Sequence, residues 1–175
     1  MKKLFFTCIV ILTYLSSKAQ TKYDTCQHLN KFEGNWKYVN GSDTVRINLR
    51  KHRFQYSVPD GPVYIMDRLF GWHEYKTGGT IIESNYSFRN MQLPQMDFPH
   101  GDSVSIFFSF ALDACSDTTH MIIGRVTDYT YADELKHVWA TLSSDGNTLY
   151  WKQEHREGFT PSGMTLPKQF ALIRQ

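Results

Sequence analysis

Seven histidines offer this chain its most versatile chemistry, because an imidazole can bind a metal ion or exchange a proton near neutral pH. They are His28, His52, His73, His100, His120, His137 and His155. None follows a zinc-ligand spacing such as His-Glu-x-x-His, and no two cysteines are spaced as zinc ligands. His73 and Glu74 are neighbours, but adjacent residues of a strand point to opposite faces. We therefore predict scattered, exposed histidines, no metal site and no cofactor.

Serine and cysteine side chains are the next candidates, as nucleophiles. The sequence has no Gly-x-Ser-x-Gly elbow. Cys115 lies between Asp113 and Asp117, and nearby acids raise a thiol pKa and so weaken the nucleophile. No catalytic residue is predicted from these patterns. An enzyme whose residues come from distant strands remains an alternative.

The first 19 residues have the pattern of a secretory signal. Lys2 and Lys3 precede an apolar run, and Ser17-Lys18-Ala19 forms a small-x-small cleavage site before Gln20. The apolar run is shorter than the roughly 20 residues that a membrane-spanning helix needs. We expect residues 1–19 to be removed and the rest to be exported, to the periplasm or the outside, without a membrane span.

Cys26 and Cys115 would then be the two remaining cysteines, and an oxidising compartment would allow them to form a disulfide. Two unpaired thiols are the alternative. Simple up-and-down strand order counts against the bridge. It would make the strand predicted at 103–112 leave the domain at the end opposite Cys26.

Charge argues against a nucleic-acid partner. Without Lys2, Lys3 and Lys18, the mature chain has 16 basic and 17 acidic residues, a net charge of −1 with neutral histidines. Nucleic-acid binding relies on clustered positive charge, and an anionic membrane surface would attract the same feature. A protein partner is not identified by the sequence.

Alternation of apolar and polar residues predicts an all-β domain. Val45, Ile47 and Leu49 share one face of a strand, and the segment 103–112 alternates in the same way. Asn40-Gly41 and Gly78-Gly79 are typical of tight hairpins. We expect a leader with one helical turn over 20–33. Residues 34–175 should then form one antiparallel up-and-down barrel of about 8–9 strands, with a β-sandwich as the alternative.

The segment Gly34-Asn35-Trp36 resembles the Gly-x-Trp start of lipocalin-like barrels, in which the tryptophan packs across the closed end. A wider pattern, including Asp67 to Tyr75 and Met164 to Leu172, resembles a family of small exported bacterial proteins of unknown function. The resemblance implies a barrel fold and an exported location. It implies no activity and no catalytic residue.

The apolar interior is the remaining candidate site. An eight-stranded barrel can be filled by side chains or can hold one small ligand. The predicted ligand pocket consists of Trp36, Tyr38, Ile106, Phe108, Phe110 and Trp139. Our leading hypothesis is a non-enzymatic protein that binds a small apolar or amphipathic molecule, with residues 85–101 as a lid. The alternative is an envelope-associated interaction module with a filled core and exposed aromatic residues such as Phe88, Phe98 or Phe159.

Overall fold

The computed structural model describes residues 20–22, 24, 26–57, 61, 63–94, 103–109, 120–131, 134–155 and 163–175. Its ten strands and two short 3-10 helices are β1 (Gln20–Lys22), η1 (His28–Phe32), β2 (Gly34–Asn40), β3 (Asp43–Ser57), β4 (Val63–Thr77), β5 (Thr80–Ser84), η2 (Tyr86–Asn90), β6 (Ile106–Ser109), β7 (Met121–Asp128), β8 (Glu134–Leu142), β9 (Thr148–His155) and β10 (Gln169–Arg174). Within these residues, no helix has the length and apolar character needed to cross a membrane.

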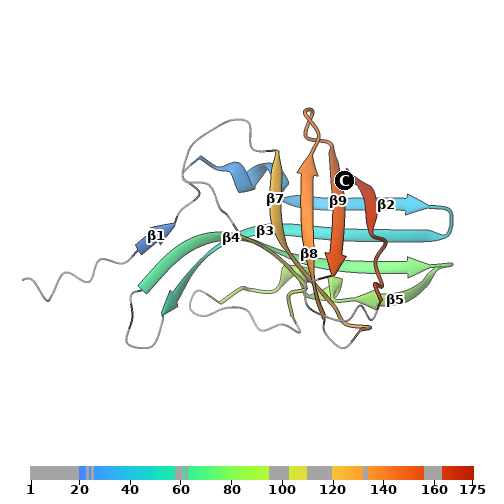
Figure 1. Ribbon diagram of the computed structural model, residues 1–175, viewed down its shortest axis with the longest axis horizontal. Helices are drawn as coiled ribbons and strands as arrows, with labels where there is room; N and C mark the ends of the chain where they lie inside the picture. Colours follow the sequence, from blue (N-terminus) through green and yellow to red (C-terminus); the bar gives the residue numbers. More distant parts are fainter. Residues whose placement is uncertain are drawn as a thin grey trace, which may run out of the picture.

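Eight of the strands form a closed ring. The order β4-β3-β2-β10-β9-β8-β7-β6 is completed by an antiparallel pairing between β4 and β6, so the first and last strands of the series also meet. Figure 1 shows β2, β3 and β4 crossing β7, β8 and β9 at a steep angle, as the two walls of a barrel. The predicted antiparallel barrel is therefore confirmed, and the sandwich alternative is wrong because the sheet closes on itself.

The predicted turn residues form the hairpins between the first strands. Asn40 pairs with Asp43, so Gly41 and Ser42 make a two-residue loop, and Gly41 has a φ of 58°. Gly78 and Gly79 join β4 to β5 with φ values of 58° and 83°. Positive φ at both positions twists a tight turn in the same sense as its strands, which is why glycine is favoured there.

The inner face of the barrel is filled with apolar side chains. Val45, Ile47 and Leu49 all point inward, as the alternation predicted, and each is at most 1% exposed. Trp151 stacks on Phe170 with ring centroids 5.9 Å apart, and Phe108 meets the same Trp151 ring edge-on at 5.9 Å. Burial of this apolar surface supplies the main stabilisation of the fold.

The edge of β4 that faces away from β3 carries three partners. β1 pairs with residues 64–66 in parallel, β6 pairs with 69–71, and β5 pairs with 74–77. β5 and β6 therefore run in the same direction, one after the other along β4. The sequence interpretation assumed that each strand reverses the one before it. For this reason it gave β6 the wrong direction: β6 runs from Gly71 of β4 towards Leu69, away from the first hairpin turn.

The direction of β6 brings the chain that follows it to the same end of the barrel as Cys26. β6 leaves the ring at the end that carries η1, which follows Cys26 in the chain, so the distance objection no longer holds. Cys26 is disulfide-bonded in the structure. The other cysteines of the chain, Cys8 and Cys115, lie outside the described residues. The pairing of Cys26 with Cys115 therefore stays a prediction.

Residues 85–94 cover the outside of the barrel wall, contrary to the lid that the sequence suggested. Leu93 packs with Phe70 and Trp72 of β4 in a second apolar cluster on the outer face. Arg50 of β3 donates hydrogen bonds to the carbonyls of Arg89 and Met91, at 3.0 and 2.6 Å. The part of the predicted lid at 95–101 lies outside the described residues.

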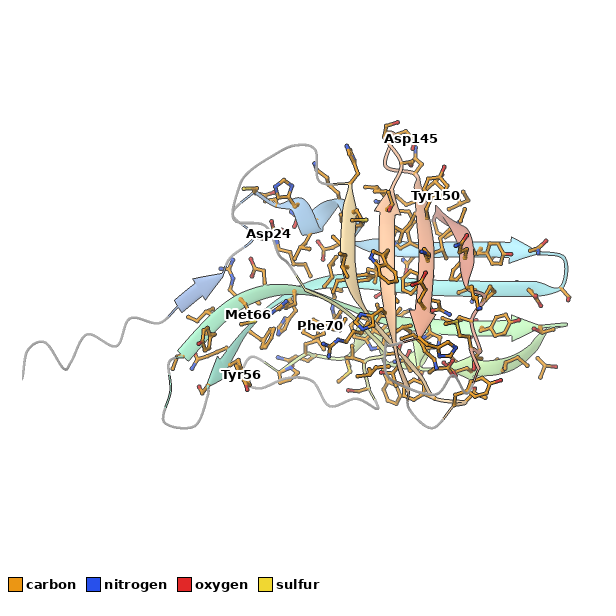
Figure 2. All side chains as sticks on the ribbon, in the orientation of Figure 1. Asp24, Tyr56, Met66, Phe70, Asp145 and Tyr150 are labelled. Carbon is orange, nitrogen blue, oxygen red and sulfur yellow. The ribbon has the colours of Figure 1, made fainter. Side chains whose placement is uncertain are left out.

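Beyond this wall, β3 and β4 continue past the ring, with Tyr56 and Met66 near the far end of this extension (Figure 2), where β1 adds a short third strand along β4.

One end of the barrel is closed by η1 and an arginine. The Arg174 guanidinium lies 4.2 Å above the Trp36 ring. It donates to the carbonyls of Lys31, Glu33 and Gly146 at 2.5, 2.6 and 3.0 Å. Trp36 itself donates to the Phe32 carbonyl at 3.0 Å. This is the position that the Gly-x-Trp resemblance implied for the tryptophan.

Candidate functional site at the barrel mouth

The structure places the predicted pocket residues in three different environments. Trp36, Ile106 and Phe108 are at most 1% exposed and belong to the core, and Tyr38 packs against its edge, with its ring 5.2 Å from Phe170. Trp139 points outward, since its neighbours Val138 and Ala140 are the inward residues of β8. Phe110 lies outside the described residues.

The mouth of the barrel, opposite η1, is covered by residues 163–168. Leu166 inserts into the core and is 3% exposed. Its carbonyl accepts a hydrogen bond from Gln153 Nε2 at 3.0 Å. Thr165 donates from its backbone N and its Oγ1 to the Asp128 carboxylate, at 2.8 and 2.7 Å. We call residues 163–168 the mouth segment.

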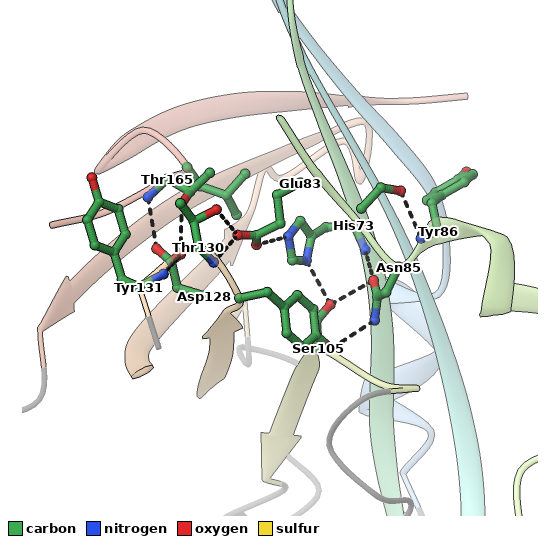
Figure 3. A network of polar contacts seen from close by, with 12 residues as sticks. His73, Glu83, Asn85, Tyr86, Ser105, Asp128, Thr130, Tyr131 and Thr165 are labelled. Carbon is green, nitrogen blue, oxygen red and sulfur yellow. Dashed lines mark hydrogen bonds and ion pairs between the residues drawn. The ribbon is translucent and has the colours of Figure 1, made fainter. Parts of the chain in front are cut away.

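Beside the mouth segment, a buried polar cluster fills the gap between β5 and the end of β7 (Figure 3). At its centre is His73, which is fully buried. The distance between His73 Nε2 and Glu83 Oε1 is 2.5 Å, and the distance between His73 Nδ1 and Ser105 Oγ is 2.7 Å. The other oxygen of Glu83 accepts hydrogen bonds from the backbone N and Oγ1 of Thr130, at 3.0 and 2.9 Å.

Asn85 ties this cluster to two further groups. Its Oδ1 accepts a hydrogen bond from the His73 backbone N at 2.9 Å and lies 3.0 Å from Ser105 Oγ. Its Nδ2 donates to the Tyr129 hydroxyl at 3.4 Å, and the Tyr129 ring stacks on His73. We call His73, Glu83, Asn85, Ser105 and Tyr129 the histidine cluster.

Glu83 is held as a carboxylate by its neighbours. Burial raises its pKa, but the hydrogen bond and charge of His73 and the two bonds from Thr130 lower it further, so the pKa lies below its usual range. The lowered pKa of Glu83 indicates that these interactions more than compensate for the hydration that the carboxylate loses on burial. Glu83 is therefore negatively charged at neutral pH.

A surface pocket of about 410 Å³ opens against this cluster. Glu83, Asn85 and Tyr129 supply part of its wall, and Ile82 and Phe88 supply the apolar part. Ile82 and Phe88 are each 48% exposed. Apolar walls with a few fixed polar groups are the usual composition of a small-molecule site. We call this the rim pocket.

The chain of contacts from Ser105 through His73 to Glu83 resembles a hydrolase triad, but Ser105 is buried, whereas a triad serine is open to the substrate. Ser105 is 3% exposed, its hydroxyl lies within hydrogen-bonding distance of Asn85, and it does not line the rim pocket. A nucleophile must reach a bound substrate. The cluster as it stands fixes the positions of Glu83 and Asn85 and offers no exposed nucleophile.

Sequence reasoning missed this cluster because it expected exposed histidines. That expectation is wrong for His28 and His73, which are 1% and 0% exposed. A signal was present for His73. The Gly78-Gly79 turn fixes the hairpin register, which places His73 across from the region of Glu83 and Asn85. The contacts with Ser105 and Thr130 depend on strands distant in sequence and had no comparable signal.

Comparison with family models gives one match over the entire sequence. The model of the family of unknown function DUF6705 matches residues 1–175. The chain belongs to this family. Membership in a family of unknown function was expected and is confirmed, whereas export and bacterial origin stay predictions. Searches of the curated proteins and of the solved structures find no match.

DUF6705 membership therefore names no ligand, so the chemistry of the site rests on its own side chains. Within the described residues, no three histidine, cysteine, aspartate or glutamate side chains gather closely enough to hold a metal ion. The histidine cluster is instead completed by neutral groups such as Ser105, Thr130 and Asn85, which donate or accept hydrogen bonds.

Proposed function

We propose that the protein is exported and binds a small amphipathic molecule in the rim pocket, without catalysing a reaction. The observation that carries the proposal is the pairing of two exposed apolar side chains, Ile82 and Phe88, with fixed polar groups in one pocket of about 410 Å³. Ligand pockets typically span about 300–1,000 Å³. The secretory pattern and the disulfide-bonded Cys26 support the exported location.

The rim pocket is a better candidate than the barrel interior, where the sequence hypothesis placed the ligand. The interior contains Trp151, Phe170 and Phe108 in direct ring contact. A ligand there would have to displace packed aromatic rings, at a cost similar to overpacking a core. At the rim, Ile82 and Phe88 already face solvent, so their burial under a ligand would contribute favourably.

The polar part of the pocket defines the ligand's other end. Glu83 is ionised and is oriented by His73 and Thr130, and Asn85 is oriented by the His73 backbone. Groups fixed before binding lose little entropy when a ligand arrives. A ligand with an apolar body and a hydrogen-bond donor near Glu83 fits this arrangement.

The first experiment is native mass spectrometry of the gently purified protein, followed by titration with 1-anilinonaphthalene-8-sulfonate. A single saturable site is expected. Phe88→Ala should weaken binding about 5–20-fold, since the ring supplies much of the apolar wall. Ile82→Ala should have a smaller effect in the same direction.

Ile81→Ala is the matched control. Ile81 is 54% exposed, adjoins Ile82 in β5 and does not line the rim pocket. The Ile81→Ala variant should therefore bind the dye with the same affinity as the wild type. Equal affinities of the Ile81 and Ile82 variants, together with an unchanged Phe88→Ala variant, would show that the rim pocket is not the site.

A further inference from the structure

The outer face of β7–β10 contains a second hollow, distinct from the barrel mouth. It has a volume of about 550 Å³. Strand register defines its composition: Trp139, Lys152 and Gln169 form one row across β8, β9 and β10. Thr141, Tyr150 and Ala171 form the next row. All six side chains lie on the outer face, and all six residues line the hollow.

The two rows contain small side chains at the base of the hollow and large aromatic side chains at its sides. Thr141 and Ala171 are small, whereas Trp139 and Tyr150 are large and lie diagonally across the β8–β9 pair. Diagonal neighbours are about 7–8 Å apart, within reach of aromatic side chains. Tyr150 is 54% exposed and projects from the sheet near the upper end of β9 (Figure 2). Two large rings therefore flank a shallow depression that is open to solvent.

The charged group that lines the hollow, Lys152, is paired with a carboxylate just outside it. Lys152 Nζ lies 2.6 Å from Glu154 Oε1 and 5.3 Å from the Trp139 ring centroid. The ammonium charge is therefore offset by a neighbouring carboxylate. Gln169 offers both a donor and an acceptor, and the Thr141 and Tyr150 hydroxyls can each do either. This set suits a neutral ligand with many hydroxyl groups better than an anion or a cation.

We infer that this hollow binds a saccharide, with Trp139 and Tyr150 as stacking platforms. A pyranose ring has an apolar C–H face, which packs on an aromatic ring, and an edge of hydroxyl groups, which accept and donate hydrogen bonds. Aromatic side chains with a polar tip serve such mixed surfaces well. Lys152 and Gln169 lie where they can bond the hydroxyl edge. A purely apolar ligand would leave these polar groups without use.

The test uses defined probes: maltohexaose, cellohexaose, laminarihexaose and chitohexaose, titrated into the exported form of the protein. Binding is followed by isothermal calorimetry and by tryptophan fluorescence, which Trp139 should report directly. At least one probe should bind with a dissociation constant of about 1 mM or lower. Trp139→Ala and Tyr150→Ala should each weaken that binding at least about tenfold.

Three control variants distinguish binding in this hollow from binding elsewhere on the protein. Trp139→Phe keeps a platform and should retain most of the affinity. Tyr56→Ala removes an exposed aromatic residue on distant β3 and should change nothing. Phe88→Ala, which tests the rim pocket, should leave saccharide binding intact, so the two sites can fail independently.

The inference is overturned if no probe binds, or if binding persists unchanged in both Trp139→Ala and Tyr150→Ala. It is also overturned if light scattering shows a dimer that Tyr150→Ala converts to monomer, because the face would then be an interface between copies. Far-ultraviolet circular dichroism checks that each variant is folded. Since both side chains are on the outer face, the fold should survive their removal.

Discussion

The two ends of the barrel are closed by different chemistry. At the η1 end, the Arg174 guanidinium lies on Trp36 and donates to three backbone carbonyls. At the mouth, the carboxylates of Asp128 and Glu83 accept hydrogen bonds from Thr165, Thr130 and His73. One end is therefore held by a cation that binds main-chain oxygens, and the other by anions that bind side chains and loop N–H groups.

This difference indicates which end can respond to its surroundings. Burial lowers the pKa of Arg174, yet the ordinary pKa of a guanidinium lies so far above neutral that the group stays charged at physiological pH. The Glu83 carboxylate at the mouth, by contrast, takes up a proton in acid, although its neighbours hold its pKa below the usual range. The η1 end is thus a fixed closure, whereas the mouth, which also contains the rim pocket, can be loosened. The predictions below test this contrast.

The largest expected effect is at the η1 end. Trp36→Ala should lower the free energy of unfolding by about 3–5 kcal/mol, because it removes a fully buried ring and leaves a cavity. Arg174→Lys should cost about 1–3 kcal/mol, since an ammonium cannot reach all three carbonyls in the planar geometry of a guanidinium. Urea unfolding followed by fluorescence measures both. If the lysine variant matched the wild type, the closure would depend on charge alone.

Asp128→Ala should have an intermediate effect at the mouth. Asp128 is 4% exposed and accepts both bonds from Thr165, so its removal leaves the Thr165 N–H without this acceptor. A loss of about 1–3 kcal/mol is expected. Hydrogen exchange should also increase in residues 163–168. Unchanged exchange there would mean that Asp128 does not hold the mouth segment.

The histidine cluster should make stability depend on pH. Glu83 has a lower pKa in the folded state than in the unfolded chain, so its contribution is complete above the ordinary glutamate pKa of about 4.3. It is lost as the pH falls through the lower folded value, because the unfolded state then binds the proton more readily. Wild-type protein should lose more stability than Glu83→Gln between neutral pH and the acid range. Parallel urea titrations at several pH values measure the difference, and identical slopes would contradict it.

The smallest effect is expected from Asp145→Ala, which serves as a counterpart to Asp128. Asp145 makes similar hydrogen bonds, to Ser143 and to Asn147, but in an exposed turn at the η1 end. Water can replace those bonds when the carboxylate is removed. The urea unfolding midpoint of the Asp145→Ala variant should stay close to that of the wild type. A loss as large as that of Asp128→Ala would show that burial does not distinguish the two aspartates.

Most of the fold, but little of the candidate site, could be predicted from the sequence. The inward positions of Val45, Ile47 and Leu49 follow from period-two alternation, and the hairpins follow from the glycine turns. The direction of β6 could not be predicted, because no sequence pattern near β6 shows that β5 and β6 pair with the same edge of β4. Trp139 was assigned to the interior by its apolar character alone. Its strand neighbours place it outside.

Closure of the ring also has consequences for how the chain folds. β2 and β10 are joined through the register pairs of Lys37 with Ile173 and Trp36 with Arg174, across most of the sequence. Pairings between such distant segments carry a large loop-closure entropy and slow folding. Until β10 has been synthesised, β2 and β9 each expose an unpaired edge, which can recruit strands from other chains. A chaperone that shields these two edges would therefore act on the nascent protein at the stage when aggregation is most favourable.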